Sequence, residues 1–335
     1  AIDAGLRGVA WFGLRHRCMV VFVPRAAVLG LSLVTTSLAL SLVHLDDGGL
    51  AQTRGRRSVP VTYEVTRLRE IPHIGKPFTQ GLEFSPQGHL VETSGDFPPG
   101  TGSFVRLLDP ETGLELLRTT GGLQASVSSG GKPVFVEGIT EMKGRWFAST
   151  YTDHVVLEYD TDFTFLRSHH YPYEGWGLTR SSGAEAFLAT NGSEYIMTLD
   201  PTTFETISVQ AATCLGKRVS GLNELEMVDD FLGHGPALLG NIINTRLVLS
   251  LDPATAQCSG VFRLEGTGLE KVRDTERWGY HVANGLAFHR PTGSLFATGK
   301  NWRSLFELRL AEMPPGPSET LEALEQHLAT ALVAT

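Results

Sequence analysis

The sequence has few cysteines and a deficit of basic residues, and both shortages exclude broad classes of protein. Its 335 residues contain Cys18, Cys214 and Cys258 and no Cys-x-x-Cys pair, so neither a disulfide scaffold nor a zinc ribbon is expected. Lysine and arginine total 28 against 36 acidic residues, a net charge of −8. Because phosphate binding needs a basic field, this balance argues against a general nucleic-acid-binding protein.

What the sequence has in excess is glycine. The chain contains 37 glycines among 335 residues, well above the usual share of about 7%. Hydrophobic residues make up 41% of the chain and charged residues 19%, so a hydrophobic core is expected and wholesale disorder is not. Many glycines imply many tight turns, and these indicate many short strands.

One long uncharged run stands near the beginning of the sequence. Residues 26–43 contain no charged side chain, Arg25 precedes them, and Asp46 and Asp47 follow. This order of charges is typical of a signal peptide or a signal anchor. A buried core helix is the less favoured alternative. Either targeting interpretation sends the rest of the chain into the secretory pathway, to be secreted or held at a membrane that the N-terminal segment contacts.

The predicted domain organisation follows from this run. Residues 1–45 form the targeting segment, with residues 1–18 upstream of a possible true start at Met19, and residues 46–60 form a solvated linker. Residues 61–310 form the main domain. Residues 311–335 form a C-terminal helix and tail, in which Ser318 caps a helix expected to run to residue 333.

The main domain repeats a three-strand pattern. Similar openings are GLEF at 81–84, GITEM at 138–142, GLT at 177–179, NELEMV at 223–228 and NGLAF at 284–288. A second strand follows each opening and often ends in Thr, Ser or Asn. In four copies a third strand then runs into an aspartate turn, at Asp109, Asp160, Asp200 and Asp252.

A repeat of 40–60 residues with several strands is typical of a propeller blade. The openings predict an all-β, five-bladed β-propeller, in which residues 61–71 supply the outer strand of the last blade and close the ring. A β-sandwich is the alternative, but a sandwich gives no reason to repeat the same opening.

The openings carry chemistry-bearing residues that a propeller would aim at its central channel. These residues are Gln80, Glu137, Trp176, Asn223, Glu224 and Asn284, and Lys300 ends the strand after the last opening. A carboxylate can move a proton, and amides with a lysine can stabilise a developing oxyanion. The competing interpretation is that these groups merely bind neighbouring blades by hydrogen bonds, and spacing alone does not decide between the two.

The same segments resemble the glutamine cyclotransferase family of plants and bacteria. FTQGLEF, FVEGIT, EGWGLT, LNELE and NGLAFHRPTGSLFATGKNW occur in family order from about Ile71 to Leu310. The resemblance implies a five-bladed propeller that converts the N-terminal glutamine of peptides and proteins into pyroglutamate and releases ammonia. The implied reaction requires no cofactor and no metal. A structural calcium ion would be compatible with a small propeller, but no ligand set in the sequence supports one.

The resemblance also implies roles for individual residues. Glu137 is the general acid and base, and Lys300 and Asn223 polarise the carboxamide oxygen. Gln80 orients the substrate amine or amide. The expected walls of the site are the aromatic residues Phe78, Phe135, Tyr151 and Trp176.

Three departures from the family pattern bear on substrate preference. Tyr151 and Ile243 stand where tryptophan is common, and Val136 precedes Glu137 where glycine is frequent. They leave the proton carrier and the amides intact, but a non-catalytic propeller that binds peptides or another partner remains the alternative. A propeller hydrolase or lactonase is a weaker one, because the openings contain too few carboxylates for a catalytic metal.

Two further expectations concern the whole molecule. Cys214 and Cys258 both fall in or beside the fourth blade, so a structural disulfide between them is possible in an oxidising compartment, with two free thiols as the alternative. The protein is expected to be a monomer.

Overall fold

The computed structural model describes residues 59–124, 133–264 and 282–330. Contacts divide the chain into Ala1–Thr53 and Arg54–Thr335, and every described residue lies in the second unit. The predicted targeting segment and most of the predicted linker therefore lie outside the described residues. In the part of the chain that the structure describes, no helix has both the length and the apolar character needed to cross a membrane.

The regular secondary structure of the described residues is almost entirely β-strand, as predicted. In order, its elements are β1 (Val61–Pro72), β2 (Thr79–Phe84), β3 (Leu90–Ser94), β4 (Phe104–Leu108), β5 (Glu115–Thr119), β6 (Val136–Met142), β7 (Arg145–Thr150), β8 (Val155–Tyr159), β9 (Phe165–His170), β10 (Leu178–Arg180), β11 (Phe187–Ala189), β12 (Tyr195–Leu199), β13 (Thr206–Ala211), β14 (Thr213–Cys214), β15 (Lys217–Arg218), β16 (Leu222–Val228), β17 (Ala237–Ile242), β18 (Leu247–Leu251), β19 (Cys258–Arg263), β20 (Ala283–His289), β21 (Ser294–Gly299), β22 (Ser304–Glu312) and α1 (Glu319–Thr330).

The strands form antiparallel meanders. Strands β2 to β5, β6 to β9 and β10 to β13 each make a four-stranded sheet, and a small β14–β15 ribbon follows them. The largest sheet has eight strands in the order β16-β17-β18-β19-β1-β22-β21-β20. Strand β1 joins its two halves, because it pairs antiparallel with β22 and, over a short stretch, parallel with β19. The prediction that residues 61–71 supply the outer strand of the last unit is confirmed.

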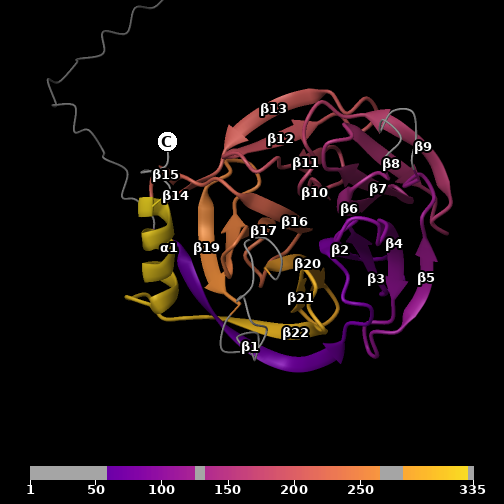
Figure 1. Ribbon diagram of the computed structural model, residues 1–335. Helices are drawn as coiled ribbons and strands as arrows, with labels where there is room; N and C mark the ends of the chain where they lie inside the picture. The colour runs from indigo at the N-terminus through magenta and orange to yellow at the C-terminus, as the bar shows by residue number, and fades with distance from the viewer. Residues whose placement is uncertain (1–58, 125–132, 265–281, 331–335) are drawn as a thin grey trace, which may run out of the picture. The chain divides into compact units, whose positions relative to one another are not determined.

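The first strands of the successive units lie around a common centre (Figure 1). Strand β2 contacts β6, β6 contacts β10, β10 contacts β16, β16 contacts β20, and β20 contacts β2. Hydrophobic clusters fill the spaces between neighbouring sheets; one of them packs Phe147 of β7 against Phe187 of β11. The remaining strands of each unit lie progressively farther from the centre.

The predicted aspartate turns connect third strands to fourth strands. In each turn the aspartate Oδ1 accepts the backbone N–H of the residue two positions later, at 2.7 Å for Asp109, 3.0 Å for Asp160, 2.8 Å for Asp200 and 2.7 Å for Asp252. Such side-chain hydrogen bonds to the backbone two residues on stabilise the turns that reverse the chain.

The C-terminal helix and a disulfide stabilise the fourth unit from outside. Ser318 caps α1 by accepting the N–H of Leu321 at 3.1 Å, and Leu324 and Leu328 are buried in the same cluster as β17 and β18 side chains. Cys214 and Cys258 form a disulfide with their Cα atoms 4.9 Å apart. Residues 331–333, the predicted end of the helix, lie outside the described residues.

Candidate functional site

Most of the side chains singled out in the openings meet in one pocket of about 440 Å³. Its lining comprises Phe78, Gln80, Asp96, Phe97, Pro99, Phe135, Glu137, Tyr151, Trp176, Asn223, Ile243 and Lys300. Every candidate catalytic and substrate-binding residue of the sequence analysis is among them. Glu224 and Asn284 lie elsewhere in the centre, and each binds its neighbours.

The position of these side chains follows from irregular pairing in the first strands. The register between β2 and β3 shifts between Thr79 and Gly81, and that between β6 and β7 shifts between Val136 and Ile139. Strand β16 shows the same shift between Leu222 and Leu225. Such bulges re-aim a side chain out of the alternating pattern. They occur at Gln80, Glu137 and Asn223, whose side chains line the pocket.

A glycine follows the site residue in most openings because the first strands approach one another closely. A Cβ on Gly177 would lie 2.2 Å from the carbonyl oxygen of Asn223. The fourth opening has Glu224 at this position instead. Its carboxylate extends across the centre and accepts the N–H groups of Leu82 at 3.4 Å and Leu286 at 3.0 Å, so it ties three units together.

Glu137 and Lys300 are two buried ionisable groups of the same pocket. They are only 6% and 7% exposed, respectively. Burial raises the pKa of Glu137 to about 8, and the nearby Lys300 ammonium opposes that rise. Burial also lowers the pKa of Lys300, while Glu137 opposes the fall. A carboxyl group with such a pKa can both take up and release a proton near neutral pH.

The two amides of the pocket are held differently. Gln80 Oε1 accepts a hydrogen bond from Asn284 Nδ2 at 3.1 Å, which fixes the orientation of the Gln80 amide. Asn223 is 2% exposed, and its Nδ2 has no hydrogen-bond partner among the described residues. Because buried donors are nearly always paired, this N–H₂ group is suited to bind an oxygen of a ligand.

Aromatic rings enclose the pocket. Phe78 lies 4.7 Å from Phe97 and 6.2 Å from Phe135 between ring centroids, and Phe135 lies 6.0 Å from Tyr151. The Lys300 Nζ lies 4.9 Å from the centroid of Phe78, within the range of a cation–π interaction.

Sequence reasoning missed three residues of the wall: Asp96, Phe97 and Pro99. They lie on the segment between β3 and β4, which is longer than the corresponding segments of the other units. Asp96 Oδ1 shapes the segment by accepting the N–H groups of Gly100 at 2.9 Å and Gly102 at 2.6 Å. The sequence signal that could have indicated an ordered loop is Asp96 followed closely by Gly100 and Gly102.

Comparison with known proteins shows to which family the chain belongs. The family model described as glutamine cyclotransferase matches residues 39–310. The chain belongs to the glutamine cyclotransferase family. It is 25% identical over 252 residues to an Arabidopsis thaliana protein named glutaminyl-peptide cyclotransferase, covering 74% of this chain and 72% of that protein. The crystal structure of Myxococcus xanthus glutaminyl cyclase matches with a TM-score of 0.65 and 27% identity, over 76% of this chain and 100% of that one. The resemblance stated from the motifs is confirmed.

The contribution of the Trp176 ring to activity can be tested by changing the glycine that packs against it. Gly192 has a φ of +81°, and a Cβ there would lie 2.6 Å from Trp176 Cη2. We expect Gly192→Ala to displace the Trp176 ring and to lower kcat/KM about 10-fold, because misplaced positioning groups cost orders of magnitude in rate. Steady-state kinetics on a peptide with N-terminal glutamine measures the effect.

Gly183→Ala is the matched control for Gly192→Ala. Gly183 has a φ of +80°, but a Cβ there meets nothing within 4 Å. Both substitutions carry the strain of a left-handed backbone, about 1–2 kcal/mol, and both should lower the melting temperature. An equal loss of activity in the two variants would contradict a specific role for the Trp176 wall.

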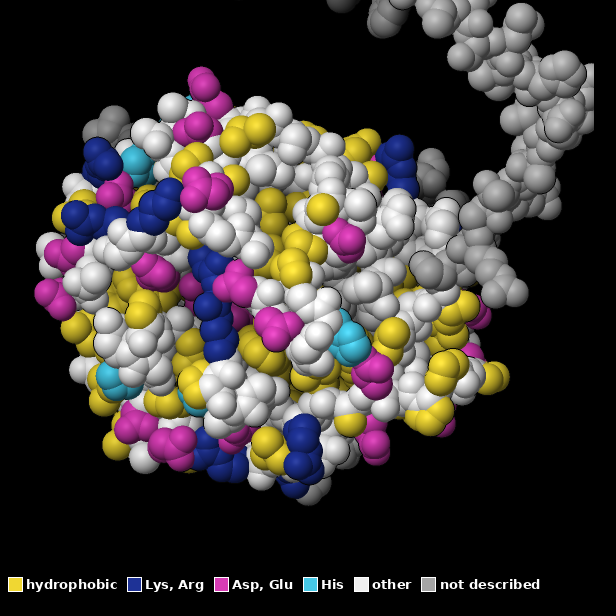
Figure 2. All heavy atoms as spheres, turned by 180° about the vertical axis from the view of Figure 1, so that it is seen from behind, with side chains coloured by type: hydrophobic (Ala, Val, Ile, Leu, Met, Phe, Trp, Pro, Cys, Tyr) yellow, Lys and Arg dark blue, Asp and Glu magenta, His cyan; other side chains and the backbone are white. Residues whose placement is uncertain are grey.

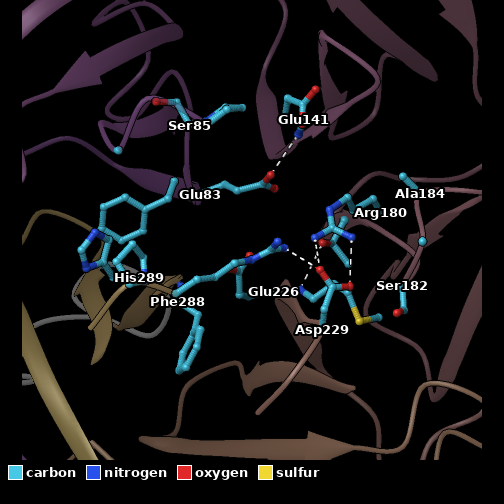
Figure 3. Close-up of a pocket in the computed structure, with 18 residues that line it drawn as sticks. Glu83, Ser85, Glu141, Arg180, Ser182, Ala184, Glu226, Asp229, Phe288 and His289 are labelled. Carbon is cyan, nitrogen blue, oxygen red and sulfur yellow. Dashed lines mark hydrogen bonds and ion pairs between the residues drawn. The ribbon is translucent and has the colours of Figure 1, made fainter. Parts of the chain in front are cut away.

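A second cavity, of about 720 Å³, lies at the other end of the first strands. Figure 3 shows Glu83, Glu226 and Arg180 converging on it. Glu83 accepts the N–H of Glu141 at 3.1 Å, and Arg180 binds both carboxylate oxygens of Asp229, at 3.2 and 2.7 Å. One oxygen of Glu83 and both oxygens of Asp229 are thus hydrogen-bonded within the protein. Within the described ranges no group of three or more His, Cys, Asp or Glu residues is placed to hold a metal ion.

The charges of the molecular surface are also mixed. On the face drawn in Figure 2, basic side chains lie next to acidic ones rather than gathering into a continuous basic patch. This distribution agrees with the net charge of −8.

The buried carboxyl of Glu83 predicts a pH-dependent stability. Burial raises its pKa to about 7 from an ordinary value of 4.5. A raised folded-state pKa contributes stability that is fully present below pH 4.5 and is lost as the pH rises through 7. We therefore expect Glu83→Gln to leave the melting temperature unchanged at pH 4.5 and to raise it at pH 8 by a few degrees, about 2–4 °C per kcal/mol.

Thermal unfolding of both proteins from pH 4.5 to 8 checks this expectation. Glutamine retains the Oε1 that accepts the Glu141 N–H, so the comparison isolates ionisation. Glu64→Gln, at an exposed position of β1, is the control and should show no pH-dependent difference. A Glu83→Gln protein whose melting temperature follows that of the wild type at every pH would disprove the prediction.

Proposed function

We propose that the protein is a glutaminyl-peptide cyclotransferase that converts the N-terminal glutamine of peptides and proteins into pyroglutamate and releases ammonia. The observation that carries the proposal is the presence of buried Glu137 and Lys300 in one pocket with Asn223, whose Nδ2 has no hydrogen-bond partner among the described residues. Family membership and the named relatives support the same reaction.

We interpret the fold as a five-bladed β-propeller. The cyclic contacts of β2, β6, β10, β16 and β20 support this interpretation, as does the eight-stranded sheet, which divides into two four-stranded halves at the β19–β1 pairing. Each blade then begins with a first strand at the channel, and the closing strand β1 joins the last blade. The pocket is one end of that channel.

The proposed reaction is an intramolecular attack. The α-amine nitrogen of the substrate bonds to the carbonyl carbon of its own side-chain amide, and the bond from that carbon to the amide nitrogen breaks. Glu137 takes one proton from the attacking amine and gives it to the departing nitrogen, which leaves as ammonia. Holding the side chain folded back supplies much of the rate enhancement.

The charges of the pocket fit this proton transfer. A peptide α-amine has a pKa of about 7.7–8.0, and burial raises the pKa of Glu137 to about 8. The proton therefore passes between groups of nearly equal affinity, as efficient general catalysis requires. We assign Lys300 and Asn223 to the carboxamide oxygen, where negative charge develops, and Gln80 to orienting the amine or amide.

The remaining parts of the proposal concern environment and assembly. We propose that no metal or other cofactor takes part, that residues 26–43 direct the chain into the secretory pathway, either as a cleaved signal or as a membrane anchor, and that the enzyme is a monomer. The Cys214–Cys258 disulfide supports an oxidising compartment. The boundaries 46–60, 61–310 and 311–335 remain our proposed linker, propeller and C-terminal segment.

Ammonia release from a short peptide with N-terminal glutamine tests the function. The full chain should turn this peptide over, should leave the N-acetylated peptide unchanged, and should be indifferent to a chelator. A folded protein that binds the peptide without releasing ammonia would overturn the enzyme in favour of the peptide-binding propeller. Activity lost to the chelator and restored by a divalent cation would overturn the metal-free scheme alone.

A further inference from the structure

The bulges that aim the site residues leave backbone groups without partners in their own sheet. Glu137 and Gly138 are skipped by the pairing of β6 with β7, and Asn223 and Glu224 by that of β16 with β17. Buried backbone carbonyl and N–H groups must nonetheless find hydrogen bonds. Where these bonds go decides how firmly each site residue is held.

The partners come from the second strand of the preceding sheet. Thr93 of β3 donates its Oγ1–H to the carbonyl oxygen of Glu137 at 2.5 Å. Thr190, which follows β11, donates to the carbonyl oxygen of Asn223 at 2.9 Å and accepts the N–H of Gly177 at 3.0 Å.

Two further second strands make the same kind of contact. Ser149 of β7 donates to the carbonyl oxygen of Trp176 at 3.3 Å. Asn241 of β17 accepts the N–H of Glu224 at 3.0 Å and donates to the carbonyl oxygen of Ala283 at 2.8 Å. These are the Thr, Ser and Asn residues that recur at the ends of the second strands in the sequence.

We propose that Thr93 is a positioning residue for Glu137, and that it acts by bonding the carbonyl group of the bulge that carries the carboxylate. Thr93 is fully buried, and its Oγ1 lies against Gly81 of β2, where an added Cβ would come within 2.9 Å of it. The inference rests on the proposed cyclotransferase function, because it assigns Thr93 an effect on turnover.

Other buried threonines of the same molecule join neighbouring sheets without contacting the pocket. At the other end of the first strands, Thr179 of β10 accepts the N–H of Met227 at 3.2 Å, and Thr140 of β6 accepts that of Arg180 at 3.2 Å. These threonines are also buried and also join neighbouring sheets, but they bond no residue of the pocket. They separate the stability of the inter-sheet bonds from the positioning of the site.

The decisive experiment compares Thr93→Val, Thr93→Ser and Thr179→Val in the full chain. Valine keeps the shape of threonine and removes the hydroxyl, whereas serine keeps the hydroxyl. We expect Thr93→Val to lower kcat about 10- to 100-fold with KM within about threefold of wild type, since displacement of a reacting group by about 1 Å costs rates of this order. Thr93→Ser should recover most of kcat, and Thr179→Val should lower the melting temperature but not kcat.

Each other outcome has a defined meaning. Thr93→Val with wild-type kcat, or with a loss of kcat matched by Thr179→Val, would overturn the inference while leaving the proposed function intact. Failure of the wild type to release ammonia would overturn the function and this inference together. If Thr93→Val does not fold, Thr93→Ser and Thr93→Ala decide the question: equal kcat in these two variants would overturn the inference, and a kcat higher in serine than in alanine would support it.

Discussion

Replacing Glu137 with glutamine is expected to lower kcat by about 10²–10⁴-fold, the share of a rate that general acid–base catalysis usually supplies. Glutamine has the shape of the carboxyl group but cannot take the amine proton at the start of the reaction. KM should change little, because the aromatic walls and the amides of Gln80 and Asn223 remain in the pocket. Ammonia release under saturating peptide measures the loss.

The Glu137→Gln protein should fold at least as well as the wild type. Because burial raises the pKa of Glu137 to about 8, its contribution to stability is present below pH 4.5 and is lost as the pH rises through 8. The variant should therefore equal the wild type in melting temperature at pH 4.5 and exceed it at pH 9. Glu141→Gln, on the same strand at the far end, is the control and should keep full activity. Glu137→Gln with kcat within tenfold of wild type would exclude Glu137 as the proton carrier.

The position of the site could be predicted from the sequence because the fold repeats. Gln80, Glu137, Trp176 and Asn223 occupy the same place in successive openings, and equal places in a cyclic repeat lie at the same level of the channel. Residue type then indicated the chemistry. The convergence of these four residues with Lys300 in one pocket required only that the strands close into a ring.

The parts that could not be predicted depend on features found in a single copy. The loop that brings Asp96 and Phe97 to the pocket is longer than the corresponding loops of the other units, so internal comparison could not place its added residues. Glu83 and Glu226 were not expected near the centre, because glutamates are rarely buried. Each accepts a backbone N–H from the next sheet, which is a contact between units and leaves no mark in the local pattern.

The pairing of Thr93 with Glu137 was visible only in part. The recurrence of Thr, Ser and Asn at the ends of the second strands could be read from the sequence, but their partners could not. The partner is a backbone carbonyl freed by a bulge in the next sheet. A bulge in an inner strand does not alter the run of apolar residues enough to be read from the sequence.

Replacing Lys300 with methionine is the second change with a large expected effect. Methionine keeps much of the apolar stem of Lys300 and removes the ammonium group that lies over Phe78. We expect kcat/KM to fall about 10²–10³-fold, as when one donor to a developing oxyanion is removed. The acidic limb of the pH–rate profile should also move to higher pH, because the Lys300 charge opposes the burial that raises the pKa of Glu137.

These two effects of Lys300→Met distinguish its possible roles. If Lys300 only tuned Glu137, the variant would recover wild-type kcat/KM at a higher pH, and a profile from pH 6 to 10 would show a displaced curve of unchanged height. If Lys300 also binds the carboxamide oxygen, as we propose, the curve is displaced and remains lower at every pH. Lys143→Met, at an exposed turn where Lys143 approaches Glu185 at 4.0 Å, should leave the profile unchanged. A Lys300→Met profile of full height would remove Lys300 from the carboxamide oxygen and leave Asn223, with its unpartnered Nδ2, as the donor that the pocket offers there.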